Sequence, residues 1–228
     1  FPSKRRFYPF GEKMKIRNRL LLNRDYLKKK AVVSGHPTEL TVELTNYCNL
    51  DCVFCPHAKM TRPKGFMDFR LFKDIVDQVK GYLELIDFDL MGETILHPEI
   101  FGIISYCKKS GIKTMLSSNM TVTDTKLAKE LISAGLDILT MNIDAATSST
   151  YESLRRGAHF AAVKQNIESI LNLSDSRLFK VVQMIYTSVN KYEADAFLKM
   201  WQNKGAQYIR LHPYENIDKQ LLELNAIP

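Results

Sequence analysis

The sequence predicts an α/β fold built on one parallel β-sheet. Between residues 38 and 211, segments with strand periodicity alternate six times with segments of helical periodicity. Gly111, Gly135 and Gly205 stand at equivalent positions, where an expected helix turns into the next strand. Such alternation implies parallel strands, because right-handed crossovers bury the faces of the sheet. Six units are too few for a closed eight-stranded barrel, so the pattern alone allows a partial barrel or a doubly wound open sheet.

The expected elements follow one another from residue 39 onward. Strands are expected where polar and apolar residues alternate or where short apolar runs occur, at 39–44, 85–91, 112–116, 136–143, 179–186 and 207–211. Asp68 and Thr123 are the expected N-caps of two helices, and Pro98 opens a third in its first turn. Helices are expected at 68–80, 98–110, 123–135, from Thr147 to a break at Gly157, over an apolar stripe of Val163, Ile167, Ile170 and Leu171, and at 192–203.

The net charge of +7 is concentrated at the amino-terminal end of the sequence. Residues 1–30 carry eleven Lys or Arg against Glu12 and Asp25, a local charge of +9. Residues 13–22 predict a short helix with an apolar side at Ile16, Leu20 and Leu21. We interpret residues 1–37 as a basic extension that packs as a solvated helix beside the core. The alternative is a contact surface for an acidic peptide, a nucleic acid or a membrane.

Composition places the chain among soluble globular proteins. Its 228 residues, 45% hydrophobic and 25% charged, are enough for one sizeable domain, expected at residues 38–228. No run of eighteen apolar residues and no signal-peptide pattern occurs, so no membrane span is expected. No basic platform interleaved with aromatic residues is evident, so a nucleic-acid partner is not expected. Clustered rather than dispersed cysteines indicate the reducing environment of a cytoplasmic protein.

Three of the four cysteines lie within eight residues, at Cys48, Cys52 and Cys55. Thiolates this close in a loop can converge on one soft metal centre. A closed structural zinc site needs a fourth ligand, and His57 lies too close to Cys55 for the usual zinc spacing. A [4Fe-4S] cluster with one open iron fits three thiolates better. A zinc-stabilised binding module is the alternative interpretation, and Cys107 is expected to be a buried structural thiol.

The spacing Cys-x3-Cys-x-aromatic-Cys, with Phe54 as the aromatic residue, resembles the signature of the radical S-adenosylmethionine (radical SAM) enzymes. The resemblance implies that the three cysteines hold a [4Fe-4S] cluster and that S-adenosylmethionine chelates its fourth iron. It also implies a partial (β/α)6 TIM-like barrel of parallel strands, and the cysteine loop after the first strand favours this fold over an open sheet. In barrel folds, functional residues gather on loops at the carboxyl ends of the strands.

Two further segments resemble motifs of this family. Residues 91–98 are similar to its Gly-Gly-Glu-Pro segment, which implies that the Gly92 backbone and the Glu93 carboxylate hold the amino group of the methionine moiety. Met91 and Thr94 depart from that pattern, where the family has Gly and Pro. Residues 117–121 resemble the Thr-Asn-Gly segment, which makes Ser118 and Asn119 candidates for polar contacts with the cofactor.

A fourth segment and the last strand ends complete the candidate site. Residues 142–146 resemble the Ser-Ile-Asp-Gly stretch of peptide-modifying members, with Asn142 and Asp144 on one side of the strand. The resemblance implies a downstream arginine for the methionine carboxylate, and the sequence does not choose between Arg155 and Arg156. Polar residues at the last two strand ends are candidate substrate contacts: Tyr186, His212 and Tyr214.

The resemblance implies the enzymatic function of the chain. It implies reductive cleavage of S-adenosylmethionine to a 5′-deoxyadenosyl radical, which abstracts hydrogen from a peptide or small-molecule substrate. An electron donor such as flavodoxin or ferredoxin is then expected as a partner. The motifs are most similar to the subgroup with SPASM or twitch domains, but no cysteine follows Cys107, so no auxiliary cluster is expected within this chain. A catalytically altered core that acts as a partner subunit is a further alternative.

Overall fold

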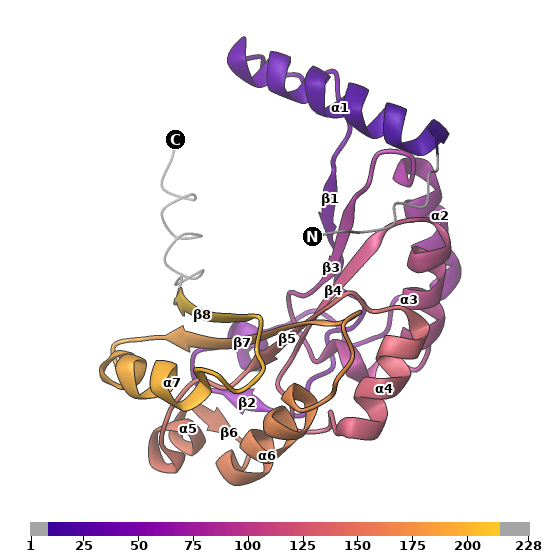
Figure 1. The fold of residues 1–228 in the computed structure, drawn as a ribbon. Helices are drawn as coiled ribbons and strands as arrows, with labels where there is room; N and C mark the ends of the chain where they lie inside the picture. Colours follow the sequence, from indigo (N-terminus) through magenta and orange to yellow (C-terminus); the bar gives the residue numbers. More distant parts are fainter. Residues whose placement is uncertain (1–8, 215–228) are drawn as a thin grey trace.

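A parallel six-stranded sheet with the order β1-β3-β4-β5-β7-β8 forms the body of the protein (Figure 1). The structure is a computed structural model that describes residues 9–214. The six strands are β1 (Glu39–Thr41), β3 (Leu85–Phe88), β4 (Lys113–Ser118), β5 (Ile138–Asn142), β7 (Phe179–Tyr186) and β8 (Tyr208–Pro213). All neighbouring strands run parallel, and the sheet curls into a half-barrel. This confirms the predicted partial TIM-like barrel.

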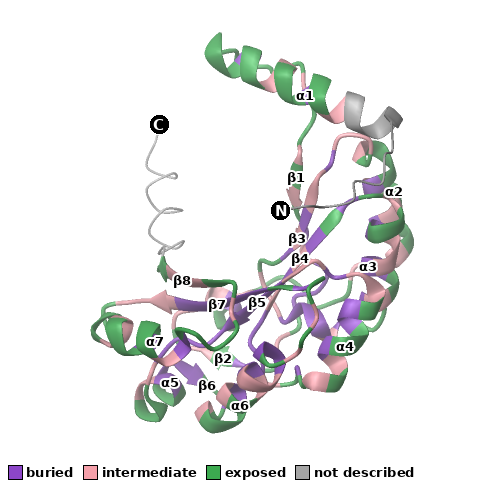
Figure 2. Cartoon of the chain, in the orientation of Figure 1, coloured by how far each residue is buried: buried purple, intermediate pink, exposed green. Residues whose placement is uncertain are grey.

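Helices cover the convex side of the half-barrel (Figure 1). They are α2 (Phe69–Val79), α3 (Ile100–Lys109), α4 (Thr125–Ala134), α5 (Ser148–Leu154), α6 (Phe160–Leu171) and α7 (Ala194–Trp201). Short 3-10 turns cover Pro56–Lys59, Thr94–Leu96 and Lys191–Glu193. The core lies between the sheet and these helices, where Phe72, Phe88 and Trp201 are fully buried. Figure 2 shows this burial along the strands and on the inner sides of the helices.

The two faces of the sheet differ in chemistry. Side chains alternate along a strand, so Ile86 and Phe88 of β3 pack under the helices, while Leu85 and Asp87 lie on the concave face. The apolar residues on the convex face are buried beneath the helices. This hydrophobic burial is the main stabilising contribution to the fold. The concave face keeps polar groups available inside the barrel.

Several predicted boundaries are wrong for identifiable reasons. The strand predicted to reach Met91 ends at Phe88, because Leu90 has a φ of 122° and its N–H donates to the Asp89 side chain. The first strand ends at Thr41 instead of Leu44, since the chain leaves the sheet and the Leu44 carbonyl accepts from Met67 N. Other strand and helix ends shift by up to a few residues, as is common at element ends.

The predicted N-cap at Thr123 is also wrong. Asp124 caps α4, and its side chain accepts a hydrogen bond from Leu127 N. Thr123 is fully buried, and its hydroxyl lies 2.9 Å from Ser118 Oγ instead. Asp68 caps α2 as predicted, because its carboxylate accepts from both Arg70 N and Leu71 N.

A small antiparallel sheet was not predicted. β2 (Asp51–Cys52) pairs with β6 (Arg155–Arg156), with Cys52 opposite Arg155 and Asp51 opposite Arg156. Two-residue strands carry no periodic signal, so the sequence pattern could not reveal them. The pairing brings the cysteine loop next to a segment more than a hundred residues later in the chain.

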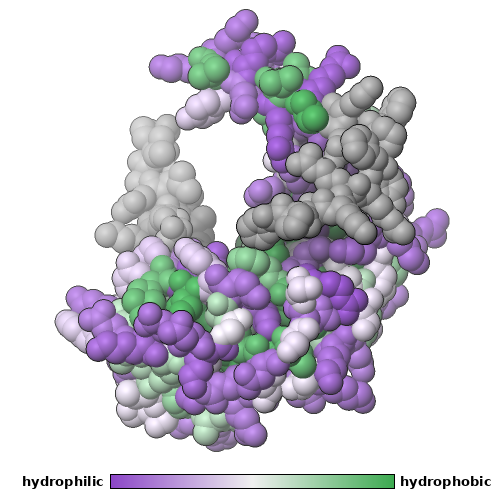
Figure 3. Space-filling model, in the orientation of Figure 1, coloured by the Kyte–Doolittle hydropathy of each residue, from purple (hydrophilic) through white to green (hydrophobic). Residues whose placement is uncertain are grey.

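Helix α1 (Pro9–Leu27) is longer than the predicted range. The side that it turns toward the body of the protein is not the predicted one. Ile16 and Leu20 are 58% and 64% exposed, so the expected apolar side faces solvent. The helix is attached to the body largely by polar contacts: Asn18 exchanges hydrogen bonds with the backbone of His36, and buried Asp25 accepts from Ser34 N. Figure 3 shows apolar side chains among the hydrophilic ones on its surface.

Helix α1 lies at the amino end of β1, away from the carboxyl ends of the strands (Figure 1). Its side chains also reach the loop before β3, where Arg19 pairs with Glu84. Within residues 9–214, no helix is both long and apolar enough to cross a membrane.

We expect Asp68→Ala to lower the free energy of unfolding by about 1 kcal/mol, because two N–H groups of α2 lose their acceptor. Urea denaturation followed by circular dichroism measures this change. Asp68→Asn is the matched control and should stay close to the parent, since asparagine caps equally well. Equal losses in both variants would contradict the assignment of the cap.

Candidate active site

The three clustered cysteines line one cavity of about 160 Å³ at the carboxyl ends of the strands. Phe54 of the same loop also lines it, with predicted site residues from four other segments: Gly92, Glu93, Ser118, Asn119, Asn142 and Arg155. Asp144, Arg156, Tyr186, His212 and Tyr214 do not line this cavity. Residues that are far apart in the sequence therefore converge as a barrel arrangement predicts.

The cysteine loop is held by backbone hydrogen bonds. Cys55 N donates to Cys52 O at 3.1 Å, and Val53 N donates to Leu154 O at 2.9 Å. All three thiols are half-buried, and burial raises the pKa of Cys52 to about 11 when no metal is present. His57 lies 2.8 Å from the Asn46 carbonyl through Nε2, which braces the segment before Cys48.

The donor set around this cavity suits an iron–sulfur cluster. Cys48, Cys52 and Cys55 all line it, and in a cubane cluster each thiolate binds a different iron. Among residues 9–214, no group of three His, Cys, Asp or Glu side chains is placed to hold a single metal ion.

Gly92 lies directly against the segment that leads into the cysteine loop. Its φ is +86°, and a Cβ there would stand 2.4 Å from Thr45 O and 2.7 Å from Tyr47 O. The next residue continues the contact, because Glu93 N donates to Tyr47 O at 2.7 Å. Only glycine permits this approach, so the loop after β3 positions the loop that carries the cysteines.

Glu93 presents a buried carboxylate oxygen with no hydrogen-bond partner. The residue is 3% exposed, and Oε2 accepts from Asn119 N at 2.7 Å. Oε1 has no partner, and burial raises the pKa of Glu93 to about 7. A buried, unsatisfied acceptor that lines a cavity is suited to a donor group on a ligand.

Amide side chains connect the next three strands along the cavity wall. Asn142 donates from Nδ2 to Ser118 O at 3.1 Å, and Gln183 donates to Asn142 Oδ1 at 2.8 Å. Asn119 donates to the Asn49 side chain at 2.9 Å, which links the end of β4 to the cysteine loop. The predicted polar residues Ser118, Asn119 and Asn142 thus belong to one hydrogen-bonded wall.

The structure separates the two candidate arginines. Arg155 is buried and forms an ion pair with Asp144, with Nε 2.5 Å from Oδ2. Its guanidinium also lies 5.7 Å from the ring centre of Phe54. Arg156 is exposed and does not line the cavity. Asp144 is fully buried and supports Arg155 without reaching the cavity itself.

The predicted substrate residues lie at the ends of β7 and β8. Tyr214 stacks edge-on against Phe54 with ring centres 6.1 Å apart, and its N–H donates to Tyr186 O. His212 is exposed, with Nδ1 2.9 Å from the Pro213 carbonyl. Tyr214 therefore stands beside the cysteine loop, as predicted for the rim of the barrel.

Sequence reasoning missed several residues that line the cavity: Leu50, His57, Asp89, Leu90, Ser117, Gln183 and Ile185. Gln183 gave a usable signal, because it is the one polar side chain in the run from Val181 to Ile185. Asp89 and Ser117 precede recognised motifs by a few residues and carried no distinguishing pattern.

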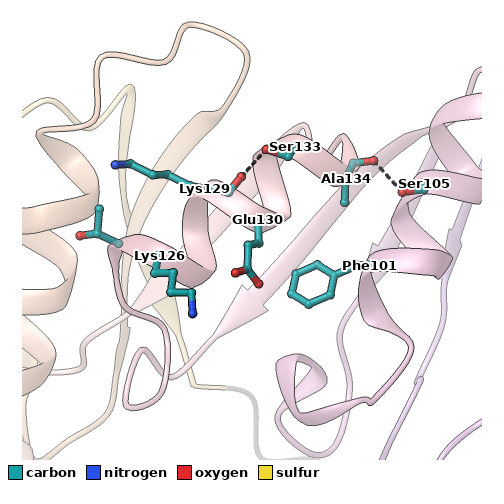
Figure 4. A pocket seen from close by; sticks show the side chains of 8 residues that line it. Phe101, Ser105, Lys126, Lys129, Glu130, Ser133 and Ala134 are labelled. Atoms are coloured by element: carbon teal, nitrogen blue, oxygen red, sulfur yellow. Dashed lines mark hydrogen bonds between the residues drawn. The ribbon is translucent and has the colours of Figure 1, made fainter.

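A larger hollow of about 750 Å³ lies elsewhere, between α3 and α4. Figure 4 shows it, with Phe101 and Ser105 on one helix and Lys129 and Glu130 on the other. None of its lining residues has a buried polar atom without a partner. We therefore take the cysteine cavity as the candidate active site, because functional side chains converge on it, although it is the smaller of the two.

The comparison with known protein families agrees with this geometry. The sequence profile of the radical SAM superfamily matches residues 42–196, which is more than half of the chain. The chain belongs to the radical SAM superfamily. The matched range includes every cysteine of the motif and the loops after β3, β4 and β5. Membership implies a [4Fe-4S] cluster and S-adenosylmethionine as cofactors.

Two relatives are similar in sequence to part of this radical SAM chain. A tungsten-containing aldehyde ferredoxin oxidoreductase cofactor-modifying protein from Pyrococcus furiosus is 32% identical over 107 residues, covering 46% of this chain and 30% of that protein. The mycofactocin maturase MftC from Mycobacterium ulcerans is 25% identical over 181 residues, covering 78% and 48%. The chain spans less than half the length of either relative.

Solved structures share the radical SAM fold. SuiB from Streptococcus suis, bound to the precursor peptide SuiA, superposes with a TM-score of 0.71 at 16% identity, covering 95% of this chain and 48% of that one. The enzyme anSMEcpe, with AdoMet and a Cp18Cys peptide, gives 0.62 at 19% identity, covering 77% and 50%. At such identities the likeness establishes the fold alone.

We expect Gly92→Ala to destabilise the protein and to lower the iron retained after anaerobic reconstitution, because the added methyl group meets the backbone at residues 45–47. Thermal unfolding and iron analysis measure both effects. Gly65→Ala is the control, since a Cβ at Gly65 meets nothing within 4 Å. If both variants behave alike, the close approach at Gly92 does not position the cysteine loop.

We expect Arg155→Gln to lower the free energy of unfolding by about 3–5 kcal/mol, because it leaves the buried Asp144 carboxylate without its charged partner. Arg156→Gln, on the exposed neighbour, should change the free energy by less than about 0.5 kcal/mol. Urea unfolding of both variants tests the contrast. Similar values for the two would show that the ion pair does not contribute as its burial predicts.

Proposed function

We propose that this protein is a radical SAM enzyme that modifies a peptide or small-molecule substrate. The observation that carries the proposal is the convergence of three thiols, an unpartnered carboxylate oxygen and a buried guanidinium on one cavity. These groups match the needs of the two cofactors: thiolates for iron, a carboxylate for an ammonium group and a guanidinium for a carboxylate.

We assign the cluster to Cys48, Cys52 and Cys55. Glu93 is assigned to the amino group of the methionine moiety, because Oε1 is buried and without a partner at the cavity. The Gly92 backbone is assigned to the same group. The fixed direction of the Glu93 side chain comes from Asn119 N, so the carboxylate is oriented before the cofactor binds.

Arg155 is the better candidate for the methionine carboxylate. It lines the cavity and is buried, whereas Arg156 is exposed. Its Nε is occupied by Asp144, which leaves the terminal nitrogens of the fork for a ligand. Polar contacts with the cofactor along the cavity wall are assigned to Ser118, Asn119 and Asn142. Phe54 is assigned to shielding the cluster from solvent.

When bound, the cluster and S-adenosylmethionine would supply the chemistry, namely reductive cleavage of the sulfonium and radical abstraction of hydrogen from the substrate. The chain's own residues bind, orient and exclude water. Leu50, Leu90 and Ile185 contribute the apolar part of the cavity lining.

The substrate and the electron donor are also part of this proposal. SuiB and anSMEcpe were solved with peptides, which supports a peptide substrate for a chain of the same fold. Tyr186, His212 and Tyr214 are proposed to contact it, because Tyr214 lies against Phe54 of the cysteine loop. We assign the donor role to a small one-electron carrier such as flavodoxin or ferredoxin.

The decisive experiment is anaerobic incubation of the reconstituted protein with dithionite and S-adenosylmethionine, with 5′-deoxyadenosine as the readout. We expect the parent and Cys107→Ala to form 5′-deoxyadenosine, because Cys107 is buried in α3 away from the cavity. Cys52→Ala should lose both the cluster signal in electron paramagnetic resonance and all 5′-deoxyadenosine.

Two outcomes would contradict this assignment. One is a parent protein that binds zinc tightly, stays colourless and forms no 5′-deoxyadenosine, which would favour a zinc-stabilised module. The other is a parent that holds the cluster but does not cleave S-adenosylmethionine, which would favour an altered core acting as a partner subunit.

A further inference from the structure

The concave face of the half-barrel carries opposite charges that do not pair with one another. Asp87 and Asp89 lie on this face at the end of β3, and Arg210 lies on it in β8, because residues two apart share a face. In the sheet order, β4, β5 and β7 separate β3 from β8. Among the described residues, no ion pair joins either acid to Arg210, and Arg210 Nε and Asp87 Oδ1 have no hydrogen-bond partner.

The curl of the sheet brings these groups within electrostatic reach. Burial raises the pKa of Asp87 to about 7, and Arg210 acts on that pKa in the opposite direction. Burial also raises the pKa of Asp89, which Arg210 and His212 lower. Arg210 therefore acts electrostatically on both acids, although no ion pair joins them among residues 9–214.

A third unsatisfied group lies on the same concave face. Gln183 of β7 is 7% exposed and stands next to Arg210 in the strand register. Its Nε2 donates to Asn142, while Oε1 has no partner. We name Asp87, Asp89, Gln183 and Arg210 the charged belt. Three polar atoms without partners thus lie on one face of the sheet: Asp87 Oδ1, Gln183 Oε1 and Arg210 Nε. Buried polar atoms without partners are costly, and a ligand on this face would supply the missing contacts.

We propose that the charged belt binds a peptide segment that carries one cationic and one anionic side chain. The cationic side chain faces Asp87 and Asp89, the anionic one faces Arg210, and Gln183 Oε1 accepts an N–H from the peptide backbone. This inference rests on the proposed function, because Asp89 and Gln183 also line the cysteine cavity and place the peptide beside the cofactor site.

A ligand with a single charge fits the belt less well. An anion alone approaches Arg210 but meets the two acids opposite, and a cation alone leaves the guanidinium uncompensated. A ligand with both charges makes a charge-assisted contact on each side of the belt.

Three peptides blocked at both termini test the proposal: acetyl-Lys-Gly-Glu-amide and two versions in which either Lys or Glu is replaced by Gln. Isothermal titration calorimetry is run on the anaerobically reconstituted protein with S-adenosylmethionine present. We expect the mixed-charge peptide to bind about tenfold more tightly than either single-charge version, as one lost charge-assisted contact implies.

Variants locate the binding at the belt. Arg210→Gln should reduce the affinity of the mixed-charge peptide to that of the version lacking Glu, and Asp89→Asn should reduce it to that of the version lacking Lys. Asp195→Asn, on the exposed side of α7, is the matched control and should bind like the parent. Asp87 is half-buried and its Oδ1 has no partner, so Asp87→Asn should remain folded, as thermal unfolding verifies, and bind about tenfold more weakly.

Two results would overturn the proposal: equal or no binding of the three peptides by the parent, or unchanged binding by the Arg210 and Asp89 variants. Formation of 5′-deoxyadenosine is measured in parallel. If it forms while the peptides do not bind, the belt proposal fails and the proposed function stands. If the peptides bind with the expected preference and no 5′-deoxyadenosine forms, the proposed function fails and the belt stands.

Discussion

The ion pair between Asp144 and Arg155 joins the cysteine loop to the barrel. Asp144 follows β5, is fully buried, and accepts hydrogen bonds from both Arg155 Nε and Ile185 N. Arg155 begins β6, which pairs with the short strand that contains Cys52. Burying two charges is costly, and this cost is offset because both Asp144 oxygens accept a hydrogen bond, one of them from the arginine itself. The position of the thiols therefore depends on contacts made at β5 and β7.

The same arginine shapes the electrostatics around the thiols. Burial raises the pKa of Cys48 and Cys52, whereas the charge of Arg155 acts on both in the lowering direction. A fixed positive charge beside buried thiols favours their thiolate form, which is the form that binds metal. One residue thus contributes to the shape of the cysteine loop and to its chemistry.

The periodicity of apolar residues predicted the strands and helices of the barrel but not its irregular segments. β7 was predicted at both of its bounds, because eight residues give a clear pattern. The pairing of Cys52 with Arg155 depends on the curled sheet and on residues a hundred positions apart, so no local pattern reports it. Asp89 was missed for the same reason, since Arg210 and His212, which lower its pKa, come from the last strand. In α1, apolar residues on two opposite sides misled the choice of inner face.

The loop that contains Gly92 shows which parts of its motif are constrained by the backbone. At Gly92 a side chain has no room, because the space is filled by main-chain atoms of residues 45–47. At Met91 the contact is made by the backbone N–H, which donates to the Glu43 side chain, and the thioether is free to vary. Thr94 donates its hydroxyl to Phe88 O and begins the 3-10 turn. A search for distant relatives of this chain should therefore weight one glycine and the glutamate after it, and tolerate variation on either side.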